Sequence, residues 1–60
     1  MKVKTSELSG RALYHAVKMA IGMYPPIIPS TEMQVKNCRL LVEAKIGHEV
    51  EIPGELMEVK

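Results

Sequence analysis

Residues 31–47 read TEMQVKNCRLLVEAKIG and specify one helix with a marked start and a marked end. Thr31 and Gln34 form a capping box, in which each side chain bonds the main-chain N–H of the other. Gly47 favours the positive φ that commonly ends a helix. The sequence therefore predicts a helix from the Thr31 cap to about Ile46.

The apolar residues of this helix form two stripes, about 160° apart at ~100° per residue. The first stripe comprises Val35, Cys38, Val42 and Ile46, the second comprises Met33, Leu40 and Ala44, and Leu41 lies between them. A small chain can cover the first stripe but hardly both. We therefore predict a homodimer with its interface at Met33, Leu40, Leu41 and Ala44.

The charged residues of the same helix are spaced for ion pairs one turn apart. Glu32 precedes Lys36 by four positions, as Arg39 precedes Glu43. Side chains at this spacing are neighbours on a helix. We expect both pairs on a single solvated stripe.

Short alternating segments flank the helical region at both ends of the chain. Val3 lies between two lysines in residues 1–5, and residues 49–52 read EVEI. Alternation of this kind is typical of half-buried strands. We predict that the two segments pair, with antiparallel orientation favoured. Val3 then faces Val50 or Ile52, and lysines lie opposite glutamates.

A first helix is predicted between the N-terminal strand and the central helix. Ser9 is a plausible N-cap, and Leu8 before it can pack on Leu13 as a hydrophobic staple. Apolar positions recur at helical spacing as far as Ile21. Gly22 then ends the helix.

The connection between the helices is stiff and apolar. Pro25, Pro26 and Pro29 prevent any helical continuation. The apolar residues in and beside it cannot be buried locally, which predicts a partner-binding patch. This patch consists of Met23, Tyr24, Ile27 and Ile28.

Length and composition limit the chain to one small domain, residues 1–60. It is 47% hydrophobic and 25% charged, with a net charge of +1, two tyrosines and no Phe or Trp. So short a chain has a marginal core. With no long apolar stretch and no secretory leader, it is expected in the cytoplasm. The predicted fold class is α+β: a helical hairpin closed by two short terminal strands, in β-α-α-β order.

Catalytic and metal chemistry find little support in the sequence. The soft metal ligands are His15, Cys38 and His48, and their spacing matches no zinc or haem motif. A thiol nucleophile needs a base and an orienting group, and the chain contains no Asp. We therefore expect no enzymatic activity, no cofactor and no metal.

A small basic face on the first helix offers a nucleic-acid alternative. It consists of Arg11, His15 and Lys18. Two helices joined by a connection also resemble a helix-turn-helix, so a DNA-binding regulator is the second functional candidate. Phosphate-tracking surfaces carry a larger basic excess than +1, which favours protein binding instead.

Two segments, one at each end of the chain, resemble the sequences of a known family. Residues 1–10, MKVKTSELSG, carry the resemblance at the N-terminus together with Ala12, Leu13, Ala16 and Val17. At the other end it is carried by Arg39, Val42, Lys45-Ile46-Gly47, residues 49–53 and Glu55-Leu56. Together these segments resemble the NinX-like family of tailed-phage and prophage proteins, and they cover about two thirds of the chain. The family's central segment is missing between Gly22 and Thr31, and Tyr14-His15 replaces an acidic-aromatic pair.

The resemblance implies a phage or prophage origin and a bacterial host cytoplasm, and it carries over no active-site residue. We expect a small accessory protein that binds a host protein as well as itself. Inhibition of a host defence or regulatory complex is the version to test first. No membrane partner is expected, and a structural role in the virion is a third possibility.

Overall fold

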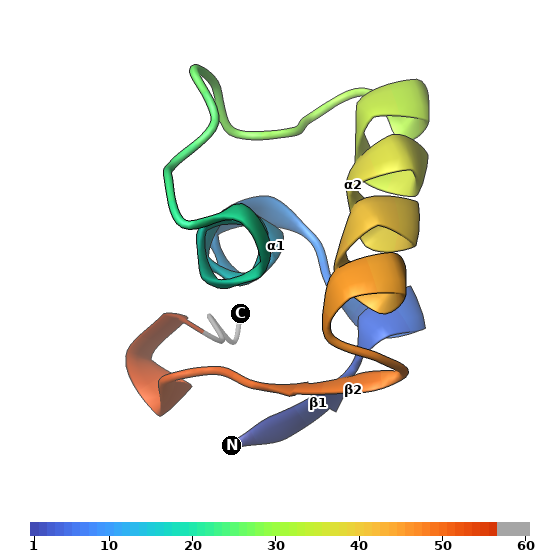
Figure 1. Cartoon of the computed structure of the whole chain (residues 1–60). Helices are drawn as coiled ribbons and strands as arrows, with labels where there is room; N and C mark the ends of the chain where they lie inside the picture. Colours follow the sequence, from blue (N-terminus) through green and yellow to red (C-terminus); the bar gives the residue numbers. More distant parts are fainter. Residues whose placement is uncertain (57–60) are drawn as a thin grey trace.

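The structure is a computed structural model that describes residues 1–56, and its elements follow the predicted β-α-α-β order (Figure 1). Short 3-10 helices follow each strand. The elements are β1 (Lys2–Lys4), η1 (Thr5–Glu7), α1 (Gly10–Ile21), α2 (Glu32–Lys45), β2 (Glu49–Glu51) and η2 (Gly54–Leu56). The α+β fold class is thus confirmed, and residues 57–60 of the predicted domain lie outside the described part.

The two strands form the predicted antiparallel sheet. Val3 is paired with Val50, and both are buried. Lys2 lies opposite Glu51 in the same register, and Lys4 lies opposite Glu49. A slip of one residue would expose the valines, so the alternating pattern explains why Val3 and Val50 share the buried face. The sequence left open whether Val3 faces Val50 or Ile52, and the structure pairs it with Val50.

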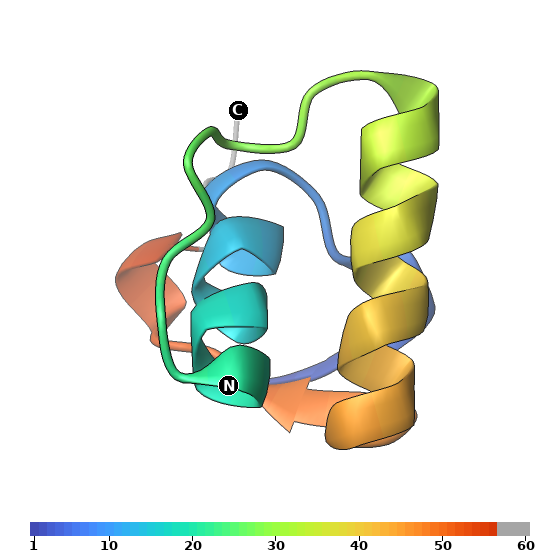
Figure 2. The same cartoon turned by 45° about the horizontal axis from the view of Figure 1, so that its top comes forward.

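The two helices pack against each other and form the helical hairpin. Figure 1 shows α1 end-on and α2 from the side, so the helices cross steeply. Figure 2 shows the connection running from the end of α1 across to the start of α2. The steep crossing leaves one side of α2 in contact with α1 and the sheet, and its opposite side in solvent.

Helix α1 begins and ends where the sequence predicts. Leu8 and Leu13 are both fully buried, as a hydrophobic staple requires. Ser9 occupies the N-cap position, but its side chain makes no capping hydrogen bond, which corrects that part of the prediction. Gly22 caps the other end with a φ of 86°, a conformation that side chains with a Cβ rarely adopt.

Helix α2 carries the predicted capping box. The Gln34 N–H donates to Thr31 Oγ1 at 3.1 Å, and the Thr31 N–H donates to Gln34 Oε1 at 3.2 Å. At the other end, the N–H groups of Ile46 and Gly47 both donate to the Val42 carbonyl. Gly47 has a φ of 129°, which fits the glycine predicted to follow the helix.

The core lies between the sheet, α1 and one side of α2. From α2, Val42 is fully buried, while Val35, Cys38 and Leu41 are half-buried against the core. The predicted inward stripe is therefore correct apart from Ile46, which is 39% exposed. Ile46 lies at the C-cap with a φ of −112°, where the chain leaves the helix and its side chain leaves the stripe. The buried side chains are Val3, Thr5, Leu8, Ala12, Leu13, Ala16, Val17, Pro29, Val42, Val50 and Ile52.

Neither predicted ion pair of α2 is present among residues 1–56. Arg39 Nε instead donates to the Leu8 carbonyl at 2.7 Å, and Glu43 Oε2 pairs with His48 Nδ1 at 2.6 Å. Both residues find partners outside the helix because the chain segments before α1 and before β2 pass beside α2. An exposed pair one turn apart contributes only a few tenths of a kcal/mol, so tertiary partners compete easily.

Candidate protein-binding surface

The connection between α1 and α2 exposes four large apolar side chains, which we call the loop patch. Met23 is 64% exposed and Ile27 is 58% exposed, and the other two members are at least two-fifths exposed. The loop patch consists of Met23, Tyr24, Ile27 and Ile28. The sequence predicted that these four side chains could not be buried locally, and in the structure all four are exposed.

The loop patch is held in place at both of its ends. Tyr24 stacks on Tyr14 of α1, with ring centroids 4.9 Å apart and an interplanar angle of 21°. The ammonium of Lys18 lies 5.8 Å from the centre of the Tyr24 ring, within cation–π range. Pro29 is buried at the other end of the patch. The prolines and these contacts fix the backbone, which lowers the entropy that a binding partner would have to remove.

One side of the loop patch opens into a shallow hollow of about 230 Å³. Tyr24 and Ile28 line it together with two members of the basic face, Arg11 and His15. Tyr14 and Leu56 complete the lining. Two of the four predicted partner-binding residues and two residues of the alternative nucleic-acid face therefore line the same hollow, which combines apolar and basic side chains.

A second apolar surface, the α2 face, lies on the outer side of α2. Met33 is 73% exposed and Leu40 is 55% exposed, and Ala44 is also exposed. We define the α2 face as these three residues. Leu41, the fourth residue predicted for a dimer interface, is half-buried and packs against the core. Its exposed part borders the α2 face.

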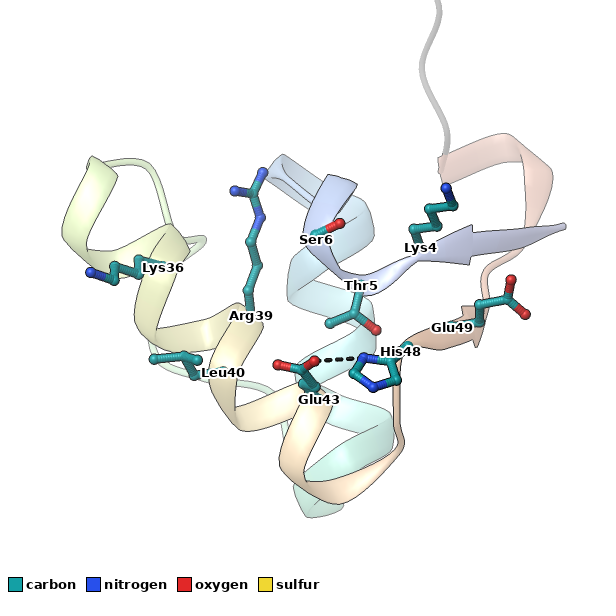
Figure 3. A pocket seen from close by; sticks show the side chains of 9 residues that line it. All are labelled: Lys4, Thr5, Ser6, Lys36, Arg39, Leu40, Glu43, His48 and Glu49. Atoms are coloured by element: carbon teal, nitrogen blue, oxygen red, sulfur yellow. Dashed lines mark ion pairs between the residues drawn. The ribbon is translucent and has the colours of Figure 1, made fainter.

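Figure 3 shows a groove of about 390 Å³ between α2 and the sheet. Lys4 and Ser6 line its sheet side, while Lys36, Arg39 and Leu40 line its helix side. The Glu43–His48 pair also contributes to its wall. The lining contains three cationic side chains (Lys4, Lys36 and Arg39) and two carboxylates (Glu43 and Glu49), so the groove has no strong single-sign charge.

Two polar tethers near this groove were not predicted from the sequence. Thr5 is 3% exposed, and its hydroxyl donates to the Gly47 carbonyl at 2.6 Å while its N–H donates to the His48 carbonyl at 2.7 Å. Arg39 reaches the Leu8 carbonyl, which is also distant in the sequence. Neither tether follows a sequence motif, because each joins a side chain to a main-chain carbonyl far away in the chain.

Among residues 1–56, the Glu51 carboxyl has a pKa below its ordinary value. The N-terminal ammonium of Met1 hydrogen-bonds Glu51 and lowers the pKa of its carboxyl, and the charge of Lys2 lowers it further. Cys38 is a free, half-buried thiol, and the His48 side chain is largely exposed. Within residues 1–56 no three His, Cys, Asp or Glu side chains are grouped so that they could hold a metal ion.

Comparisons with protein-family models, curated proteins and solved structures returned no significant match. Neither of the two described helices is long and apolar enough to cross a membrane.

Proposed function

We propose that this chain is a non-enzymatic protein-binding protein that docks on another protein through the loop patch. The observation that carries the proposal is that these four apolar side chains are exposed on a backbone fixed by prolines and by the Tyr14–Tyr24 stack. A flexible apolar loop of this size would collapse onto the domain or lose much of its binding energy to ordering. A rigid one keeps its apolar anchors ready for a complementary pocket.

Basic side chains beside the loop patch favour a partner with negatively charged groups around its apolar contact. Arg11 and His15 line the hollow beside Tyr24, and Lys18 lies over the Tyr24 ring. A partner that inserts an apolar side chain and places carboxylates around it would match both the apolar and the basic side chains. Charge complementarity of this kind raises the rate of association and fixes the orientation of the complex.

The setting we propose is that of a small phage or prophage accessory protein in the host cytoplasm. This part of the proposal rests on the resemblance of residues 1–10, 45–47 and 49–53 to the NinX-like family. A chain of this size can act by occupying a surface that a host complex needs for its own assembly. We therefore propose that binding inhibits a host defence or regulatory complex.

The test is capture from a bacterial host lysate with the wild-type chain and two matched variants. Ile28→Ala removes a loop-patch side chain that is 43% exposed, and Ile46→Ala removes the same side chain at a site 39% exposed beyond the far end of α2. We expect one host protein to bind the wild type and Ile46→Ala but to be depleted by Ile28→Ala. Titration with the purified partner should then show that Ile28→Ala weakens binding about tenfold or more.

The salt dependence of binding distinguishes protein binding through the loop patch from DNA binding. Capture through the loop patch should persist at high salt because apolar contacts dominate it, whereas phosphate contacts weaken steeply. A DNA mobility shift that vanishes with salt and with Arg11→Glu, accompanied by no protein partner, would replace the proposal with the DNA-binding alternative. Equal loss of binding in Ile28→Ala and Ile46→Ala would show that the loop patch is not the docking site.

A further inference from the structure

We infer that the α2 face is a self-complementary interface, on which a second copy of this chain packs with its α2 antiparallel to the first. The apolar centre of this face is exposed at Met33 and Leu40. Lys36 and Glu43 flank Leu40 along the helix, as Figure 3 shows. These two opposite charges decide the orientation of the second copy.

The two charges lie on the same flank of the α2 face. At about 100° per residue, Lys36 and Glu43 are separated by only about 20° around the helix axis. Both are rotated from Met33 and Leu40 to the same side, whereas Asn37 and Leu41 lie on the other flank. One flank therefore carries a positive and a negative side chain, Lys36 and Glu43, whereas Asn37 and Leu41 on the other flank are uncharged.

A two-fold axis makes the charged flank complementary to itself. In an antiparallel pair related by such an axis, a given flank of one helix meets the same flank of the other in reverse order. Lys36 then lies opposite Glu43 of the second copy, and Glu43 lies opposite Lys36 of the second copy. In a parallel pair the charged flank would meet Asn37 and Leu41, and neither charge would gain a partner.

The same axis places apolar side chains at the centre. The point midway between Lys36 and Glu43 lies within about 1 Å, along the helix, of Leu40, at 1.5 Å rise per residue. Leu40 therefore meets Leu40 of the second copy. Hollows of about 390 and 420 Å³ lie on either side of Lys36, one lined by Leu40 and the other by Met33. They provide space for side chains that enter from the second helix.

The intramolecular partner of Glu43 is compatible with this pairing. His48 Nδ1 contacts Glu43 Oε2 at 2.6 Å. A carboxylate has two oxygens and accepts several hydrogen bonds, so Glu43 can also accept from Lys36 of the second copy. The histidine holds the carboxylate at the edge of α2 and limits its freedom before the dimer forms.

The inference is tested by charge reversal, with the dimer measured by analytical ultracentrifugation over a concentration series. We expect Lys36→Glu alone and Glu43→Lys alone each to weaken the dimer at least about tenfold, because each places like charges opposite one another twice. An equimolar mixture of the two variants should form a heterodimer of wild-type affinity, since both facing pairs are then opposite in sign. Lys45→Glu makes the same charge change away from the flank and should leave the dimer intact.

His48→Ala separates the intermolecular role of Glu43 from its contact within the chain. Both His48→Ala and Glu43→Lys remove the contact between residues 43 and 48, but His48→Ala keeps the Glu43 carboxylate. His48→Ala should therefore leave the dimer unchanged. Recovery of the dimer in the mixture of Lys36→Glu and Glu43→Lys also shows that both charge variants are folded. Failure of the mixture to dimerise while each variant remains folded would overturn the antiparallel pairing.

Cysteine cross-linking in a Cys38→Ala variant measures directly whether the two α2 helices are antiparallel or parallel. Leu40→Cys should form an intermolecular disulfide on mild oxidation, whereas Met33→Cys should not, because the two copies of residue 33 would lie about 20 Å apart along the helices. Disulfides at both positions would show a parallel pair. A wild-type chain that stays monomeric throughout the concentration series would refute the inference, whatever protein binds the loop patch.

Discussion

Arg39 Nε donates a hydrogen bond of 2.7 Å to the main-chain carbonyl of Leu8, which joins the middle of α2 to the residue that ends η1. The Leu8 side chain is fully buried, so this bond fixes the backbone of a core residue. Helix α2 is thus held by a polar tether as well as by its apolar stripe. The core of so short a chain is small, so the roughly 1 kcal/mol that such a hydrogen bond contributes is a sizeable fraction of a marginal stability.

Removal of this tether should destabilise the domain. Arg39→Ala leaves the part-buried Leu8 carbonyl without its charged donor, and we expect a loss of about 1–2 kcal/mol in the free energy of unfolding. Lys45→Ala, at an exposed position of the same helix away from the α2 face, should change it by less than about 0.5 kcal/mol. Urea denaturation followed by circular dichroism measures both values. Equal effects of the two substitutions would contradict the structural role of Arg39.

The buried hydroxyl of Thr5 should matter through its hydrogen bond rather than its volume. Thr5→Val keeps the shape of the side chain but removes the donor to the Gly47 carbonyl, so we expect a loss of about 1–2 kcal/mol. Ser6→Ala, an exposed neighbour, provides the control and should be close to neutral. Thermal unfolding of the two variants would test this, and a neutral Thr5→Val would show that the tether adds nothing.

The capping box should set the stability of the first turn of α2. Thr31→Ala removes the acceptor of the Gln34 N–H and should lower the free energy of unfolding by about 1 kcal/mol. Ser30→Ala is the matched control, because Ser30 contributes only its main-chain N–H to Gln34 Oε1. Amide hydrogen exchange should show faster exchange confined to the start of α2 in Thr31→Ala. Unchanged protection there would contradict the capping role.

Acid should weaken the contact between Glu51 and the Met1 ammonium. The ammonium lowers the folded-state pKa of Glu51 below its ordinary value of 4.5, so this contact stabilises the fold above that pH. The contribution is lost as the pH falls from 4.5 through the lowered pKa. Melting temperatures measured across this range should therefore decline less in Glu51→Gln than in the wild type.

Glu49→Gln provides the control for the acid prediction. It removes the same charge on the same strand, opposite Lys4 and away from Met1. Its melting temperature should decline with pH more nearly as that of the wild type does. The prediction is refuted if Glu51→Gln and the wild type lose stability in parallel over the whole range.

Local chemistry in the sequence determined the elements and their order. The capping box joins two residues three positions apart, and Gly22 directly follows the last residue of α1. Helix boundaries could therefore be recognised without any tertiary contact. The alternation around Val3 and Val50 determined which face of each strand is buried, because side chains on a strand alternate between two faces. The pairing of Val3 with Val50 rather than with Ile52 was decided by the tertiary structure. The exposure of Met33, Leu40 and the loop patch also followed from the sequence, since so short a chain cannot cover every apolar stripe.

Tertiary structure alone decided the partners of Arg39 and Glu43. Arg39 and Glu43 are spaced for each other, yet each bonds a residue from another segment, because Leu8 and His48 are brought beside α2 by the fold. Stacking of Tyr14 on Tyr24 likewise joins the basic face to the loop patch around one hollow. Contacts between distant segments depend on how the helices cross, and that angle follows from the packing of the whole core rather than from any local pattern.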